Sequence, residues 1–206
     1  MEELVPKKMK GKNNRVSSEA RLHTAVAAGQ TFEQVKHMLL HPKLWTKAAG
    51  VAGSDFELFD PQGNVRGEEA RAGDKIRIDV PGPGTKVGDG YDWVEIKTLG
   101  GWEDGNQSKY FGIQLEPTDN PVSGSERTAH FLKKGATSTF VVHLSENTVT
   151  LNYFGRNEEI NLHPQGFIQK IRNLFVGAGA MVGLSEVQWK TLVDGMLHSA
   201  SPETQS

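Results

Sequence analysis

The chain has 206 residues, a formal net charge of −2 at pH 7 and no cysteine. Its length is sufficient for one domain with a sizeable core. The charge provides no basic field for nucleic acid. The absence of cysteine excludes disulfides, zinc–thiolate sites and thiol catalysis. We therefore expect one domain that acts without nucleic acid.

The two ends of the chain are polar. Residues 1–14 contain four lysines and no apolar run of the kind found in secretory signals. No stretch of about 18 apolar residues is present, so no helix is expected to span a membrane. We expect a disordered basic tail over 1–14, a single domain over 15–198, a frayed tail over 199–206 and a cytoplasmic location.

The first predicted elements are a strand and a helix. Over 17–26, apolar and small residues alternate with charged ones, which is typical of a half-buried strand. Thr31 is placed to cap a helix over 32–40, and Pro42 ends that helix. The buried stripe of the helix is predicted to consist of Phe32, Val35 and Leu39.

The middle of the chain is rich in strands. Alternating apolar residues mark segments around 56–59, 76–80, 94–96, 111–115, 140–144 and 149–153. Clusters of glycine, proline, asparagine and aspartate separate most of these segments. Because no helical pattern intervenes, antiparallel pairing is favoured over parallel crossover units.

A helical period returns near the C-terminus. From Pro164, apolar residues recur every three or four positions, and Ser185 with Gln188 forms a second capping box. The pattern predicts either one helix kinked near Gly183 or two helices end to end. The order of elements predicts an α+β fold in which a curved antiparallel sheet wraps around the C-terminal helix and encloses a cavity.

Several short motifs accompany this order of elements: Thr31-Phe32-Glu33-Gln34-Val35, Leu44-Trp45-Thr46-Lys47, Thr128-Ala129-His130-Phe131, Ala136-Thr137-Ser138-Thr139-Phe140, Gly155-Arg156-Asn157-Glu158 and Gln188-Trp189-Lys190. Over about residues 16–198 the chain resembles the START-like, polyketide-cyclase-like (SRPBCC) superfamily, and within it an uncharacterised bacterial branch. The resemblance implies a helix-grip fold. The superfamily includes lipid carriers, hormone receptors, cyclases, oxygenase subunits and chaperone activators, so the fold does not decide the function. The glycine-rich C-terminal region departs from the single long helix of the superfamily.

The candidate ligand-binding residues are aromatic or polar. If Val94 and Ile96 face the core, the two-residue period puts Asp92 on the same side. A carboxyl at a cavity mouth would have a raised pKa or a partner, and the alternative is a rim position in water. Four aromatic residues either line the cavity or only pack: Trp45, Trp93, Trp102 and Tyr153.

Two further candidates have alternative roles. Arg156 could bind a carboxylate, either of a ligand or of Glu158, or form a structural ion pair. Gly179 either leaves room for a ligand or lets the helix pack closely on the sheet. The glycine-rich segment 177–183 lacks the second strand and the acidic residue of a dinucleotide site, so no such cofactor is predicted.

The histidines are scattered. His37 and His41 have a spacing that suits a metal, but they lie opposite the apolar stripe, and a solvated face is the preferred interpretation. His130 is either a hydrogen-bonded sheet residue or a polar group of the cavity. The sequence predicts no specific transition-metal site and no cofactor.

Together these patterns predict binding of a small apolar or lipid-like molecule between the sheet and the C-terminal helix. One alternative is a cyclase- or dehydratase-like enzyme in which Asp92 or His130 moves a proton. Another is an adaptor that binds a protein partner or a second copy of the chain, similar to chaperone activators. An enclosed pocket with a perturbed acid favours the enzyme, a cavity without polar groups favours a carrier, and a filled core with an exposed apolar patch favours the adaptor.

Overall fold

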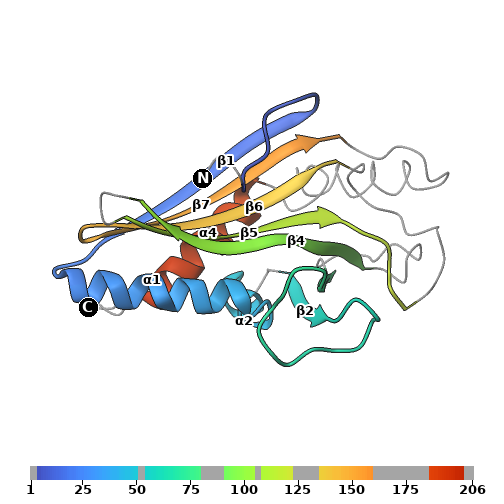
Figure 1. Cartoon of the computed structure of the whole chain (residues 1–206), viewed down its shortest axis with the longest axis horizontal. Helices are drawn as coiled ribbons and strands as arrows, with labels where there is room; N and C mark the ends of the chain where they lie inside the picture. Colours follow the sequence, from blue (N-terminus) through green and yellow to red (C-terminus); the bar gives the residue numbers. More distant parts are fainter. Residues whose placement is uncertain are drawn as a thin grey trace.

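A computed structural model of the chain describes residues 4–50, 54–79, 91–104, 108–122, 135–159 and 186–201. These residues form one seven-stranded antiparallel sheet with helices packed against it (Figure 1). The strands are β1 (Lys12–Arg21), β2 (Asp55–Phe59), β3 (Lys75–Asp79), β4 (Asp92–Glu103), β5 (Lys109–Pro117), β6 (Thr137–Ser145) and β7 (Thr148–Glu158). Their order across the sheet is β1-β7-β6-β5-β4-β3-β2, so the first and second strands lie at opposite edges.

The helices are α1 (Ala25–Leu40), α2 (Lys43–Ala48) and α4 (Glu186–Ala200). Their apolar residues share one core with every second residue of the strands, as with Phe140 and Val142 of β6. We call this side of the sheet the inner face and the other side the outer face. The helix α4 contacts β1, β7, α1 and α2. The predicted α+β fold, a curved antiparallel sheet with a C-terminal helix, is confirmed.

The N-terminal elements begin earlier than the sequence predicts. The strand is β1 rather than 17–26, and α1 starts at Ala25 rather than at residue 32. The reason is a different cap: the Thr24 hydroxyl accepts a hydrogen bond from the Ala27 N–H at 3.1 Å, which stabilises an earlier first turn. The predicted stripe of Phe32, Val35 and Leu39 is buried as expected.

The segment before β1 packs on the outer face. Leu4 is 6 % exposed and lies in a small apolar cluster with Val141 and Phe154. Gln114 Nε2 donates a hydrogen bond to the Leu4 carbonyl at 2.7 Å, and a side chain at Gly112 would overlap Leu4. Leu4 therefore attaches the segment before β1 to the outer face of the sheet.

A close crossing fixes α4 against α2. A methyl group at Gly195 would overlap the carbonyl group of Ala48, so this approach of the two helices requires glycine. Among the described helices, none is long and apolar enough to cross a membrane. The predicted break near Gly183 lies outside the described residues.

Candidate functional site

Aromatic side chains from five elements, three strands and two helices, meet on the inner face. Trp45 lies with its ring centroid 5.5 Å from that of Phe56 and 5.2 Å from that of Phe140. Tyr153 lies 5.2 Å from Phe140 and stacks on Trp189 at 4.3 Å. Four of these rings are almost fully buried and Trp189 is 7 % exposed. We call these five residues the aromatic row; their contacts provide apolar surface and rigidity.

The aromatic row ends at a hydrogen-bonded polar group. The Tyr153 hydroxyl lies 3.1 Å from Ser138 Oγ and donates a hydrogen bond to Glu158 Oε1 at 3.3 Å. Burial, followed by the charge of Glu158, raises the pKa of Tyr153 well above 10. Tyr153 therefore remains a neutral hydrogen-bond donor at any physiological pH.

Local backbone geometry brings Glu158 to this position. Strict alternation from Tyr153 would turn Glu158 toward the outer face. Instead, Asn157 has a left-handed φ of 57° and the β1–β7 register shifts beside it. Such an irregularity redirects a side chain. Gly155 leaves space for two side chains, because a methyl group there would overlap Asn14 Oδ1 and Glu158 Oε1. Burial raises the pKa of Glu158, while Lys12 and the Tyr153 hydrogen bond lower it.

Asp92 lies on the inner face at the same end of the sheet. It is opposite Ile78, which is opposite Phe56, and directly opposed residues share a face. Strands β4 and β6 begin at this end and β7 ends there, so Asp92 is at the same end as Ser138 and Glu158.

The Asp92 carboxyl is partly accessible and has no partner within the described part of the chain. Among the described residues, none forms a hydrogen bond or an ion pair with its side chain. Burial raises the pKa of Asp92 to about 8. At neutral pH the side chain is therefore mostly a neutral acid, which can donate one hydrogen bond and accept others.

Other predicted site residues lie elsewhere. Trp93 is on the outer face, where its ring lies 4.9 Å from that of Phe59. Trp102 stacks on Tyr110, also on the outer face. Trp45 belongs to the aromatic row, and its indole N–H donates to the Met38 carbonyl at 2.7 Å.

Arg156 also lies on the outer face. Its guanidinium is 5.1 Å from the Phe154 ring centroid, and Nη1 donates to the carbonyls of Asn14 and Gly155 at 2.9 and 3.0 Å. Burial lowers the pKa of Arg156. These contacts hold β1 to β7, and among the described carboxylates Arg156 has no ion-pair partner. His130 and Gly179 lie outside the described residues.

Two surface hollows are formed by described residues, and neither is lined by the aromatic row. One, of about 810 Å³, is lined by Val26, Gly29, Gln30, Glu33, Gln34, His37 and Ala200. The other, of about 220 Å³, is lined by Phe32, Glu33, Lys36, Gly101, Trp102, Glu103, Lys109, Tyr110 and Phe111. The cavity between the sheet and the C-terminal helix therefore stays a prediction.

One group of described residues has the composition of a metal site. His37, His41 and Glu69 each offer one ligand atom, and the three atoms lie within 4.8 Å of one another. Sequence reasoning missed Glu69 because it is distant along the chain from both histidines. The four-residue spacing of the two histidines was the signal in the sequence that could have indicated this group.

In comparisons with known proteins, the chain is similar to several solved structures. No protein-family model matches the chain, and no curated protein matches it in sequence. It is similar to the Zhui aromatase/cyclase from Streptomyces, with 9 % identity, a TM-score of 0.45, and 95 % of this chain and 98 % of that chain covered.

Two more solved structures show a similar degree of likeness. A norcoclaurine synthase from Thalictrum flavum has 10 % identity and a TM-score of 0.45, covering 97 % of this chain and 100 % of that chain. The major latex-like protein 151 from Panax ginseng has 12 % identity and a TM-score of 0.41, covering 93 % and 100 %. At these identities no ligand or activity follows for this chain.

Proposed function

We propose that this protein binds a small, largely apolar molecule with a hydrogen-bond acceptor, and that protonated Asp92 donates to that acceptor. The observation that carries the proposal is Asp92 itself. Its side chain lies on the inner face in line with Ile78 and Phe56, and no described residue satisfies it. Carboxyl groups in such surroundings are uncommon away from functional sites.

The surroundings of Asp92 favour a neutral ligand group. Because burial raises the pKa of Asp92 to about 8, the acid carries a proton at pH 7. A protonated acid binds a carbonyl or hydroxyl oxygen without the cost of a buried charge. The buried apolar neighbours on β2 and β3 make the surroundings of Asp92 apolar, which suits a largely apolar molecule.

The experiment is a titration with Nile red, a neutral apolar dye with a carbonyl oxygen. Wild-type protein should bind the dye at pH 6.5 and more weakly, by about tenfold, at pH 9.5, where Asp92 is ionised and can no longer donate. The Asp92→Asn variant keeps a donor and should bind equally at both pH values. The matched control is Asp79→Asn, an exposed residue at the same end of the sheet, which should behave like wild type.

The outcomes are distinct. Wild-type protein that binds no dye at either pH would refute the binding proposal. Dye binding with the same pH dependence in wild type and Asp92→Asn would show that Asp92 does not contribute to binding, and would refute the assigned role.

A second candidate function is proton transfer, and the same carboxyl favours it. A group with a pKa near the working pH is effective as a general acid or base. We would incubate the protein with apolar ketones in deuterated water and follow exchange of the protons beside the carbonyl by NMR. Faster exchange with wild type than with Asp92→Asn supports an enzyme; equal rates leave binding as the function.

A further inference from the structure

The C-terminal end of α1 carries two adjacent imidazoles. His37 and His41 are one helical turn apart, and their ring centroids are 4.0 Å from each other. His37 is exposed and His41 is half-buried. Two histidines at this spacing place their rings on the same side of a helix, where both can reach one ion.

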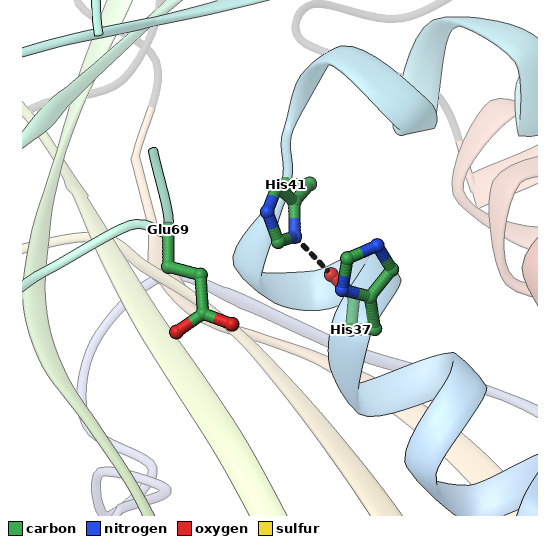
Figure 2. A group of neighbouring side chains, drawn as sticks. All are labelled: His37, His41 and Glu69. Carbon is green, nitrogen blue, oxygen red and sulfur yellow. Dashed lines mark hydrogen bonds between the residues drawn. The ribbon is translucent and has the colours of Figure 1, made fainter. Parts of the chain in front are cut away.

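The hydrogen bonding of His41 fixes which nitrogen is free. Its Nδ1 lies 2.8 Å from the His37 carbonyl oxygen (Figure 2). A carbonyl oxygen can only accept, so Nδ1 carries the hydrogen and the lone pair of the neutral ring is on Nε2. A backbone carbonyl that orients one ring nitrogen is the usual support for a histidine that binds a metal through the other.

Glu69 reaches the histidines from a separate segment, the loop between β2 and β3 (Figure 2). The loop is attached to α1 at the next residue: Ala70 is 3 % exposed, and its N–H donates to the Leu40 carbonyl at 2.8 Å. This bond holds the backbone of Glu69 beside the end of the helix. The carboxylate is exposed and free to rotate toward an ion.

Other contacts keep this loop in place. The Arg71 N–H donates to Asp74 Oδ2 at 2.8 Å, and Arg66 Nε lies 3.4 Å from the same oxygen. Asp74 is in turn fixed to β4, because its carbonyl accepts from the Ile96 N–H at 2.8 Å. The backbone position of Glu69 is therefore set before any ion binds, which reduces the cost of assembling a site.

We propose that His37, His41 and Glu69 bind one divalent transition-metal ion of the zinc type at the end of α1. Two imidazoles and a carboxylate form a donor set that suits zinc, and the C-terminal end of a helix favours a positive charge. Ligand atoms in a tetrahedral zinc site are roughly 3.3 Å apart, given bonds of about 2.0–2.2 Å. Small rotations of the exposed His37 and Glu69 side chains would therefore close the present separation of at most 4.8 Å.

Three protein ligands leave a fourth position open. His37 also lines the 810 Å³ hollow along α1, so that position is accessible from the surface. A site of this composition could bind water, an anion or a side chain of another molecule at its open position. This differs from the expectation of no metal site, which considered the two histidines without Glu69.

The test uses the full chain without a polyhistidine tag. Zinc is titrated in competition with a chromophoric chelator, and cobalt(II) is titrated while its visible absorption reports the coordination geometry. Wild type should bind one equivalent of either metal. His37→Ala and Glu69→Gln, both at exposed positions, should each weaken binding by at least about tenfold, because even supporting residues around a metal contribute that much.

Two matched controls separate this site from general metal binding. Glu68→Gln removes the adjacent carboxylate, which pairs with Arg66 and Arg71 instead, and His198→Gln removes an exposed histidine on α4. Both variants should bind metal like wild type. Absence of stoichiometric binding, unchanged affinity in Glu69→Gln, or equal losses in the controls would each overturn the three-residue site.

Discussion

Asp92 and Glu158 lie at the same end of the inner face, yet they have opposite surroundings. Glu158 accepts a hydrogen bond from Tyr153 and is influenced by Lys12. Asp92 has neither kind of contact among the described residues, and burial alone raises its pKa to about 8. Of these two carboxyls, Glu158 thus has partners among the described residues and Asp92 has none there.

The difference indicates which carboxyl is structural. A satisfied group orders its neighbours and has little remaining capacity for a ligand, whereas an unsatisfied one costs stability unless something binds it. Stability–function trade-offs of this kind are found at binding and catalytic sites. The comparison is consistent with a structural role for Tyr153 and Glu158 and with the ligand-binding role that we propose for Asp92.

The largest expected effect concerns stability as a function of pH. The pKa of Asp92 is raised from 3.8 to about 8 on folding, so between these values the folded state binds a proton that the unfolded state releases. The free energy of unfolding should fall as pH rises from about 4 to 8, by at most about 1.4 kcal/mol per pH unit. Partial access to water reduces that slope.

The Asp92→Asn variant tests this directly, because its amide does not ionise. Its advantage over wild type should grow across this range and reach about 3–5 kcal/mol above pH 8. Urea denaturation at pH 5, 6.5, 8 and 9 measures it, with Asp79→Asn expected to follow wild type. Parallel curves for wild type and Asp92→Asn would show that Asp92 does not titrate in this way.

A smaller effect on the free energy of unfolding is expected at Gly155, beside the Glu158 carboxylate. In Gly155→Ala the new methyl group would displace the Asn14 side chain and the Glu158 carboxylate, and we expect a loss of about 1–3 kcal/mol in the free energy of unfolding. Gly100→Ala is the control, because a methyl group on that strand glycine has nothing within 4 Å. Equal melting midpoints for the two variants would mean that the close approach at Gly155 is not required.

The smallest effect concerns the hydroxyl that satisfies Glu158. Tyr153→Phe should cost about 1–1.5 kcal/mol, because it leaves Ser138 and Glu158 without this partner. It should also raise the pKa of Glu158, measured by NMR, while that of Asp92 stays unchanged. Tyr110→Phe removes an exposed hydroxyl bonded to Asp104 and serves as the control. A change in the pKa of Asp92 in Tyr153→Phe would show instead that the two carboxyls are coupled.

Much of the fold could be predicted because strand alternation is a direct record of which side is buried. The start of α1 could not be predicted in this way. Leu22, Thr24 and Val26 continue the alternating pattern of a strand, but Val26 lies in the helix and is 72 % exposed. Over residues 25–31 this helix buries only Ala28 and Thr31, so its first turns lack an apolar stripe. There the cap at Thr24 decides the structure.

The site was predictable in part for the same reason. The two-residue period correctly puts Asp92 on the face of Ile96, and the same rule puts the adjacent Trp93 on the other face. The position of Glu158 depends on the left-handed Asn157, which alternation does not reveal. Glu69 lies near His41 because a backbone hydrogen bond joins Ala70 to Leu40. This contact between distant segments has no local signature in the sequence.

The pairing of β1 with β7 has a consequence for synthesis. Val16 is opposite Tyr153, so a ribosome must release most of the chain before β1 finds its neighbour. Pairing over such sequence distances is slow, and an unpaired apolar strand would meanwhile risk aggregation. Val16 is the single buried residue of β1, and its neighbours are mostly charged or polar. The first strand thus has the composition that keeps a nascent chain in solution until its partner is made.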